Sequence, residues 1–421
     1  MSPETGNDPE NQMEPYGARS TTNGKKPVNP IFNYFTYLAY IYTLGISSIH
    51  TWETPLYTSL KMAETTASIE LPVIDISNPN DPAVGKAMLE AAAKYGFLYV
   101  NSKGTDFTIQ DVDNGFGLSK KFFASPPHEK ETCRIQQNNQ GWSGMHTETL
   151  DPEHQRTGDF KEAMNFGDFK DGKAQQPLPP SLAPHEAEIN GFAELCNKIC
   201  NRILTLLALG LEIQEDFFTT RHGPHKGSTG SILRYLYYPS IFSPSTASYK
   251  HDKDVRAGAH SDYGSITLLF QRPGQPGLEI LTPEGSWAPV PIVPGSAAEA
   301  AGYPFPPILV NIGDLLSYWT DGLLKSTVHR VVFPLDEQRS PNPQDRYTLV
   351  YFCHPLDETE LVPVPSKVVA AHRERKEAVP SDGRVGFGGG AGTMEPGKRP
   401  LTAHEHLMSR LEATYEFTKD E

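Results

Sequence analysis

The chain has 421 residues, and its 51 acidic and 37 basic side chains leave a formal charge of −14, which argues against a nucleic-acid-binding protein with its basic face. Hydrophobic residues make up 38% of the sequence, which argues against a wholly disordered chain, and 35 Gly with 37 Pro favour many turns over a helical bundle. Four Cys make no disulfide framework, and we expect Cys196 and Cys200 to be buried thiols.

Residues 1–68 are predicted to form a disordered or weakly structured leader. The first 30 residues are polar and do not open with the basic segment of a secretory signal, so we expect a cytoplasmic protein. Residues 31–49 carry no charge and are long enough to span a membrane, but Asn33 and Thr43 make a poor lipid-facing helix. A surface helix or a disordered segment is favoured there, with membrane contact as the alternative.

Residues 69–225 are predicted to form a helical N-terminal region that opens with a strand. The run 69–77 (IELPVIDIS) is apolar and strand-like, and an amphipathic helix after it passes through Gly96 into a strand over Phe97–Val100. Loops are expected from there up to residue 184, interrupted by a helix. The further helices are expected around 116–124 and over 185–215.

Residues 226–421 are predicted to form a β-rich core that ends in a helix. From Ser231 onward, short β-rich runs alternate with turn residues, which is typical of a sandwich or barrel. Because the helices come first and the strands later, a parallel α/β fold is disfavoured. A Gly-rich loop is expected at 383–392 and a final helix near 401–417. We therefore expect a mainly β fold with flanking helices.

The pattern His260-Ser261-Asp262, together with a distant His329, is typical of a metal centre. Residues i and i+2 of a strand point to one face, so His260 and Asp262 can approach one ion. His329 lies in another strand-like run and could complete the set. Two imidazoles and one carboxylate leave adjacent positions open on the metal, which suits non-haem Fe(II) and its oxygen chemistry.

A His-x-acid match carries little information by itself. With 14 His and 51 acidic residues, chance predicts about two matches, and a second one exists at His146 and Glu148. That second pair lies in a polar loop, where solvated side chains are expected. His260 and Asp262 instead precede the apolar run SITLLFQ, which a buried site needs.

A receptor for a carboxylate is predicted beside this centre. Arg346 and Thr348 share one face of a strand, and a guanidinium with a nearby hydroxyl suits a carboxylate. Phe352 lies on the same predicted face and could line the pocket or pack in the core. Three tyrosines of one strand could add another hydrogen bond: Tyr235, Tyr237 and Tyr238. A surface ion pair for Arg346 and amphipathic packing for the tyrosines are the alternatives.

Other candidate sites have weaker support. His222 and His225 have metal-like spacing but lie in a Gly/Pro-rich loop. His404 and His406 lie on an expected helix, where residues i and i+2 diverge, so solvated side chains are expected. The sequence has no G-x-S-x-G elbow for a Ser-His-Asp hydrolase.

The motifs above, taken with further stretches in the same order along the chain, resemble the iron(II)- and 2-oxoglutarate-dependent dioxygenases of the isopenicillin N synthase-like type. The resemblance covers residues 69–356 and the C-terminal helix, and leaves the leader 1–68 outside. The matching stretches are IELPVIDIS, AAAKYGFLYVNSKG, KKFFASPPHEKE, KEAMNFG, LRYLYYP, AHSDYGSITLLFQ, GLEIL, ILVNIGDLLSYWTDGLLKSTVHRVV, RYTLVYFCHP and LTAHEHLMSRLEATY.

The resemblance implies a double-stranded β-helix, or jelly roll, with helices packed outside. The implied iron ligands are His260, Asp262 and His329. The implied contacts to the distal carboxylate of 2-oxoglutarate are Arg346, Thr348 and, among the tyrosines, first of all Tyr238. The implied reaction consumes O2 and 2-oxoglutarate, and a ferryl oxidant then abstracts hydrogen from a small organic molecule such as a secondary metabolite.

Some positions depart from the family pattern without removing an implied ligand. Thr348 stands where Ser is usual, and Leu236 stands where plant relatives commonly have Asn. The segments 294–307 and 336–345 look like insertions between strands, where extra length costs little.

Two alternatives to this function stay open. The chain could be an Fe(II) oxidase of the isopenicillin N synthase type that does not use 2-oxoglutarate, because Arg346 could equally hold a carboxylate of the substrate. A non-catalytic barrel that only binds a small molecule is disfavoured by the intact ligand set. Hydroxylation, desaturation, ring closure and epoxidation are all open as outcomes.

Overall fold

The computed structural model describes residues 69–251, 253–296, 299, 302–377 and 399–414. The predicted leader 1–68, with its uncharged segment 31–49, and the Gly-rich loop 383–392 lie outside the described residues. Within the described ranges, no helix is both long and apolar enough to cross a membrane.

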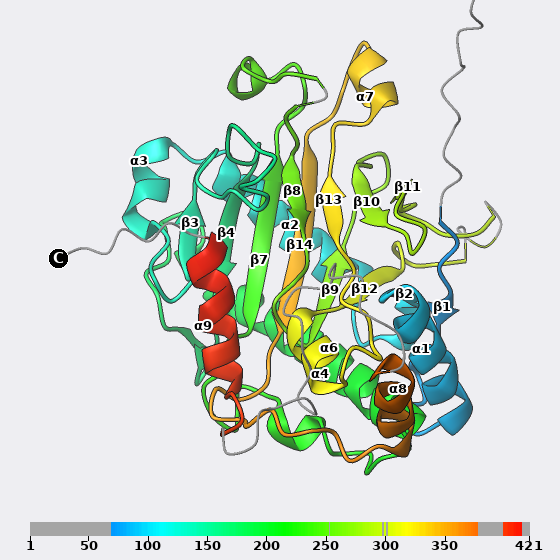
Figure 1. Ribbon diagram of the computed structural model, residues 1–421. Coiled ribbons are helices and arrows are strands. Elements are labelled where there is room, and N and C mark those ends of the chain that lie inside the picture. The colour runs from blue at the N-terminus through cyan, green and yellow to red at the C-terminus, as the bar shows by residue number, and fades with distance from the viewer. Residues whose placement is uncertain (1–68, 252, 297–298, 300–301, 378–398, 415–421) are drawn as a thin grey trace, which may run out of the picture. The chain divides into compact units, whose positions relative to one another are not determined.

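An eight-stranded sheet is the largest element of the fold (Figure 1). All neighbouring strands in it run antiparallel except β1 and β2, which are parallel. In spatial order the strands are β1 (Val73–Ile74), β2 (Phe97–Val100), β12 (Ile308–Ile312), β9 (Ile266–Phe270), β14 (Arg346–Cys353), β7 (Ile232–Tyr238), β4 (Glu162–Phe166) and β3 (Gly141–Ser143).

A four-stranded antiparallel sheet packs against the large one. Its strands, in spatial order, are β11 (Trp287–Pro289), β10 (Leu278–Leu281), β13 (His329–Val331) and β8 (Ala257–His260). Apolar side chains of both sheets form one buried cluster, which includes Leu236 and Val350 from the large sheet and Ala257 and Ile280 from the small one. Two sheets packed in this way confirm the predicted mainly β architecture.

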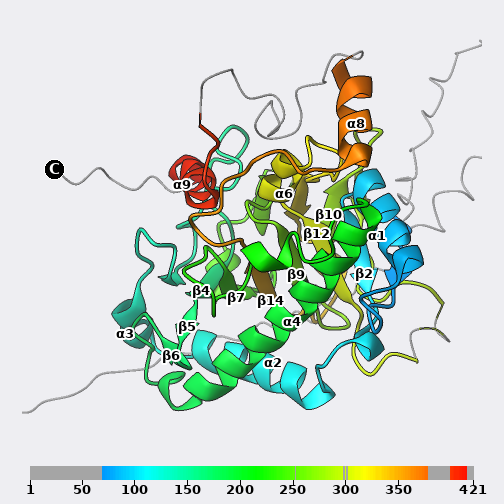
Figure 2. The ribbon, with the colours of Figure 1, turned by 90° about the horizontal axis from the view of Figure 1, so that it is seen from below.

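Helices cover the other face of the large sheet. Along β14, Val350 and Phe352 pack between the sheets, whereas Leu349 and Tyr351 pack in the cluster shared with the helices. In Figure 2 this helical layer lies in front of the strands, which α4 crosses. Its members are α1 (Pro82–Lys94), α2 (Ile109–Phe123) and α4 (Glu186–Gly210). The shorter helices are α3 (Pro127–Lys130), α6 (Asp314–Trp319), α7 (Leu335–Arg339), α8 (Lys367–Glu377) and α9 (Ala403–Thr414).

Capping residues in the sequence determine where α1 and α2 begin. Asp81 caps α1 by accepting a hydrogen bond from the Ala83 backbone, and Pro82 takes the first helical position, where its missing N–H costs nothing. In α2, Thr108 and Asp111 form a capping box. This box starts α2 seven residues before the predicted helix 116–124. As expected, Cys196 and Cys200 lie buried in α4.

Before residue 185 the structure has a different strand content from that predicted. Strand β1 covers only part of the expected run 69–77, because Pro72 lacks an N–H and Asp75 accepts a hydrogen bond from the Ser77 backbone that begins a turn. The expected loops contain β3, β4 and a hairpin of β5 (Phe169–Lys170) with β6 (Lys173–Ala174). Strand β4 is buried on both faces, so it lacks the polar–apolar alternation that marks a half-covered strand.

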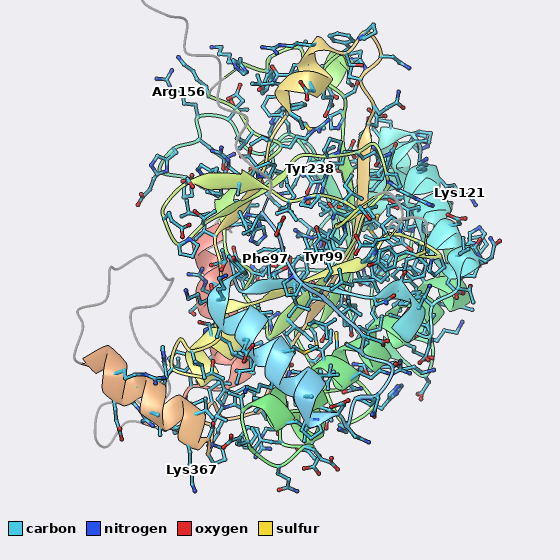
Figure 3. All side chains as sticks on the ribbon, turned by 90° about the vertical axis from the view of Figure 1, so that its right-hand side faces the viewer. Phe97, Tyr99, Lys121, Arg156, Tyr238 and Lys367 are labelled. Atoms are coloured by element: carbon cyan, nitrogen blue, oxygen red, sulfur yellow. The ribbon has the colours of Figure 1, made fainter. Side chains whose placement is uncertain are left out.

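The space between the two sheets holds the predicted metal ligand His329 and the aromatic side chains around it. Figure 3 shows Phe97, Tyr99 and Tyr238 in the interior, whereas Lys121 and Lys367 lie at the surface. Phe97 packs its ring edge-on against His329, with 5.5 Å between ring centroids. The interior of the sandwich is thus where a predicted metal ligand meets the core.

Candidate metal centre

The two histidines of the predicted centre are direct neighbours in the small sheet. His260 ends β8, His329 begins β13, and the antiparallel pairing sets them opposite each other. Their ring centroids are 4.3 Å apart. Residues far apart in the chain are therefore brought together by strand register alone.

Asp262 completes the group from the turn that follows β8. Its Oδ1 atom lies 3.9 Å from Nε2 of His260 and 3.8 Å from Nε2 of His329. The three ligand atoms all lie within 4.8 Å of one another, a spacing that could hold one metal ion. The structure thus brings together the three side chains that the sequence singled out.

Backbone carbonyl groups orient both imidazoles. Nδ1 of His260 lies 2.7 Å from the carbonyl oxygen of Gly258, and Nδ1 of His329 lies 3.1 Å from that of Thr327. A carbonyl can only accept, so each Nδ1 carries the proton and each Nε2 keeps its lone pair for a metal. Burial lowers the pKa of His260 to about 3, with His329 adding to the effect, so the ring is neutral near pH 7 and able to ligate.

The carboxylate of Asp262 is fixed from the large sheet. Its Oδ2 atom accepts hydrogen bonds of 2.7 Å from the Thr267 hydroxyl on β9 and the Asn311 amide on β12. Burial alone would raise the pKa of Asp262, but the two imidazoles and these two donors outweigh burial and lower it. Oδ1 is left facing the histidines, as a metal-binding carboxylate requires.

Arg346 lies buried at the start of β14, opposite Tyr238 of β7. Its guanidinium donates to the Gln275 carbonyl at 3.2 Å and to the Gln271 side chain at 3.4 Å, and lies 4.9 Å from the centroid of the Tyr238 ring. Within the described part of the chain, no carboxylate lies within ion-pair distance of it. Burial accordingly lowers the pKa of Arg346 to about 10. A buried cation with only neutral partners is a receptor for an anion.

Thr348 lies two residues after Arg346 on the same face of β14 and supplies a second polar group for a ligand. Its hydroxyl is buried and has no hydrogen-bond partner among the described residues. A buried hydroxyl without a partner costs free energy, which an added acceptor would recover. A carboxylate bound by Arg346 and Thr348 would satisfy both groups.

An inner cavity joins the carboxylate receptor to the metal centre. It is lined by the predicted ligands His260, Asp262 and His329, by Arg346, Thr348 and Tyr238, and by Phe97, Leu150, Lys161, Arg234, Leu236, Ala257, Thr267, Leu269, Leu278, Asn311, Val331, Val350 and Phe352. Strand alternation separates the three candidate tyrosines. Tyr238 faces this cavity, whereas Tyr235 and Tyr237 face the helices and pack on Phe166 and Phe123.

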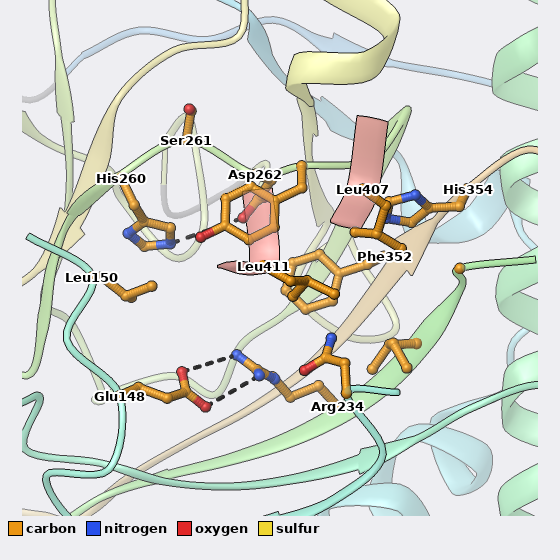
Figure 4. A pocket seen from close by; sticks show the side chains of 14 residues that line it. Glu148, Leu150, Arg234, His260, Ser261, Asp262, Phe352, His354, Leu407 and Leu411 are labelled. Atoms are coloured by element: carbon orange, nitrogen blue, oxygen red, sulfur yellow. Dashed lines mark hydrogen bonds and ion pairs between the residues drawn. The ribbon is translucent and has the colours of Figure 1, made fainter. Parts of the chain in front are cut away.

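An outer cavity opens on the other side of His260 and Asp262 (Figure 4). It shares Leu150, Arg234 and Phe352 with the inner cavity, so Phe352 does line the pocket. Leu407 and Leu411 of α9 form part of its apolar wall. A molecule in this cavity would lie beside the metal centre, on the far side from Arg346.

A buried network of charges, which the sequence pattern did not indicate, lines both cavities. Glu148 forms ion pairs with Arg234 at 3.2 Å and with Lys161 at 3.0 Å, and Lys161 also pairs with Asp159. Figure 4 shows Arg234 and Glu148 facing each other across two dashed contacts. The two cations and two anions balance, so the network adds no net charge to the pocket.

The solvated side chains predicted for His146 and Glu148 are therefore wrong for Glu148, whereas His146 is half-buried. Glu148 is 2% exposed, and the Ser143 hydroxyl donates to it at 2.8 Å. Burial raises the pKa of Glu148, but Arg234 and Lys161 outweigh it and hold that pKa well below its usual value. His146 packs edge-on against Phe160, with 4.5 Å between ring centroids. The sequence does indicate that Arg234 faces the cavity, because the two-residue period of a strand puts Arg234 on the same face as Tyr238.

The weaker histidine candidates divide into buried and exposed side chains. His222 is buried, with its ring nitrogens near the Phe218 carbonyl and the Ser265 hydroxyl, while His225 is exposed. The solvated side chains predicted for the final helix are correct for His404 and wrong for His406, which is buried against Tyr318. The helix turns His406 inward because residues two apart on a helix point about 200° apart.

Comparison with known proteins identifies the fold and the chemistry. Residues 71–186 match the family described as non-haem dioxygenase in morphine synthesis N-terminal, and residues 229–355 match the 2OG-Fe(II) oxygenase superfamily. The UPF0676 protein C1494.01 of Schizosaccharomyces pombe is 37% identical over 327 residues, which cover 76% of this chain and 93% of that protein. The 2-oxoglutarate-dependent dioxygenase caaD of Aspergillus niger is 27% identical, with coverage of 64% and 81%.

A solved structure gives the same result. A full-length Neurospora crassa protein, crystallised in complex with alpha-KG (2-oxoglutarate), is 27% identical and aligns with a TM-score of 0.62 over 81% of this chain and 96% of that one. The predicted double-stranded β-helix is thereby confirmed. The chain belongs to the 2OG-Fe(II) oxygenase superfamily and is a non-haem dioxygenase that uses Fe(II), 2-oxoglutarate and O2 on a small molecule.

Proposed function

We propose that His260, Asp262 and His329 bind the Fe(II) of this oxygenase. The observation that carries the proposal is the convergence of two Nε2 atoms and one carboxylate oxygen within 4.8 Å, each oriented by hydrogen bonds at its other atom. A facial set of two histidines and one carboxylate leaves neighbouring positions open on the metal. Fe(II) bound there, with 2-oxoglutarate and O2, supplies the oxidising chemistry of the superfamily.

Arg346, Thr348 and Tyr238 bind the distal carboxylate of 2-oxoglutarate. The guanidinium can form a charge-assisted pair with that carboxylate, and the Thr348 hydroxyl can donate to the remaining oxygen. The aliphatic wall of the inner cavity, which includes Leu278 and Val331, suits the methylene groups of the co-substrate. The co-substrate would thus span the inner cavity between Arg346 and the metal.

The substrate is a small, uncharged organic molecule that occupies the outer cavity. Glu148 already neutralises the cation Arg234, so the cavity offers hydrogen-bonding groups without a free charge to bind an acid or an amine. Leu150, Phe352 and Leu407 supply apolar contacts on the other sides. The Neurospora crassa relative was also crystallised with thymine, a molecule of this class, and other relatives are named as dioxygenases of different metabolites.

One assay tests the iron and co-substrate assignments. Full-length protein is supplied with Fe(II), ascorbate, 2-oxoglutarate and a panel of uncharged metabolites that includes thymine, and succinate formation is measured. We expect His260→Ala to abolish succinate formation and the exposed control His128→Ala to retain it. Unchanged succinate formation in His260→Ala would refute the ligand assignment.

A further inference from the structure

The C-terminal helix α9 contributes a wall to the outer cavity. Leu407 and Leu411 line that cavity together with His260 and Asp262 (Figure 4), and both leucines are almost fully buried. The position of α9 therefore decides how far the substrate pocket is closed.

An ion pair to a buried carboxylate adds to the apolar contacts that hold this helix on the interior. Arg410, one position before Leu411, forms a 2.6 Å ion pair with Oδ2 of Asp314, whose side chain is 1% exposed. The same Nη2 atom donates to the Ser261 hydroxyl at 3.4 Å, and that hydroxyl in turn donates to Asp314 at 3.1 Å. Among the described residues, Arg410 is the one cation within ion-pair distance of this buried carboxylate, so their separation would leave a buried charge unpaired.

The contacts of Arg410 converge on the turn that carries Asp262. Ser261 directly precedes Asp262, and Tyr263 directly follows it with its ring centroid 5.1 Å from the guanidinium. Asp314, the first residue of α6, donates its backbone N–H to the carbonyl oxygen of Asp262 at 2.7 Å. Arg410 thus reaches Asp262 through both of its neighbours and through Asp314.

We propose that Arg410 is a positioning residue that couples closure of the substrate pocket by α9 to the orientation of the Asp262 carboxylate. The proposal rests on the assignment of Asp262 as a metal ligand. When Arg410 pairs with Asp314 and Ser261, the two leucines of α9 cover the outer cavity and the turn 261–263 is held fixed. When the pair is broken, α9 moves away, and the turn loses the contacts of Arg410 with Ser261 and Tyr263.

The test compares full-length wild type with Arg410→Gln and Arg410→Lys, using Co(II) as the probe for the metal site. For Arg410→Gln we expect about tenfold weaker Co(II) binding, a changed visible Co(II) spectrum and about tenfold faster hydrogen exchange in residues 403–414. Arg410→Lys should recover part of each effect, since it keeps the charge but not the planar fork. The matched control is Arg399→Gln, which breaks the exposed pair between Arg399 and Glu405 of the same helix and should leave all three readouts unchanged.

The outcomes separate the proposal from its premise. A folded Arg410→Gln protein with wild-type Co(II) affinity and spectrum overturns the coupling, whether or not exchange in α9 is faster. If Arg410→Gln does not fold, Ser261→Ala replaces it, because this variant keeps the ion pair and removes only the bridging hydroxyl. An unchanged Co(II) spectrum in Ser261→Ala then overturns the coupling. If Asp262→Ala binds Co(II) as tightly as the wild type, the assignment of Asp262 as a metal ligand itself fails.

Discussion

The Asn311 side chain donates a 2.7 Å hydrogen bond to Oδ2 of Asp262, and so links the large sheet to the candidate metal centre at the small sheet. The two histidines belong to the small sheet, whereas both donors to the Asp262 carboxylate, Asn311 and Thr267, belong to the large one. The relative position of the sheets therefore sets the direction in which Oδ1 would face a metal ion bound by the histidines. Outer contacts of this kind hold a carboxylate ligand in place.

Removal of one of these donors should weaken metal binding without unfolding the protein. In Thr267→Val the shape of the side chain is kept and the hydrogen bond to Asp262 is lost, so the carboxylate can rotate. We expect Fe(II) or Co(II) affinity to fall about tenfold, measured by titration under anaerobic conditions. The control Thr267→Ser retains the hydroxyl and should bind within about twofold of wild type. Equal affinity in Thr267→Val would show that Asn311 alone suffices.

Thr348 provides a direct test of the 2-oxoglutarate site. Its hydroxyl is buried and without a partner among the described residues, so Thr348→Val should cost the free protein little and should weaken only the complex. We expect KM for 2-oxoglutarate to rise about tenfold in Thr348→Val and to stay near wild type in Thr348→Ser. Initial rates of succinate formation against 2-oxoglutarate concentration measure both. A KM that is unchanged in Thr348→Val would remove this hydroxyl from the carboxylate site.

Much of the candidate site could be predicted because strand geometry is local. The two-residue period places Arg346 and Thr348 on one face. It also predicted that His260 and Asp262 approach each other, although Asp262 lies in the turn just after β8. The choice among the tyrosines needed the structure. Strand β7 is buried on both faces, so hydrophobic contrast does not tell which face of the strand meets the cavity.

The charge network could not be predicted because its burial depends on distant partners. Glu148 comes from a polar loop, and its pairing with Arg234 and Lys161, together with the Ser143 hydroxyl, stabilises it in an interior position. No local pattern reports contacts between residues that are up to 86 positions apart. The strands β3 and β4 were missed for a related reason, since a strand gains its pairing from the sheet it joins.

Loss of one member of this network should destabilise the fold strongly. In Glu148→Gln the buried cations Arg234 and Lys161 lose their shared anion, and we expect the free energy of unfolding to fall by about 3 kcal/mol. Chemical denaturation followed by fluorescence measures the change. The control Glu131→Gln breaks an exposed ion pair with Arg134 and should leave stability unchanged within error. If the free energy of unfolding falls no more in Glu148→Gln than in the control, the ion pairs of Glu148 contribute little to stability.

Asp168 should make stability depend on pH between about 4 and 6. Burial raises the pKa of Asp168 to about 6, although the backbone and hydroxyl of Thr229 donate to its carboxylate. The folded protein thus binds a proton more tightly than the unfolded chain, whose carboxyl titrates near 3.8. The contribution of the protonated carboxyl is fully present below about pH 4 and is lost as the pH rises through 6.

Asp168→Asn removes this titration while it keeps an acceptor for Thr229. Relative to the variant, the wild type should lose about 1 to 3 kcal/mol of stability between pH 4 and pH 7, because a shift of about two pKa units is worth at most about 3 kcal/mol. Thermal melts of both proteins across this range give the difference directly. The exposed control Asp171→Asn should show no such slope. A stability difference between wild type and Asp168→Asn that is constant from pH 4 to 7 would mean that Asp168 is ionised as readily in the fold as in water.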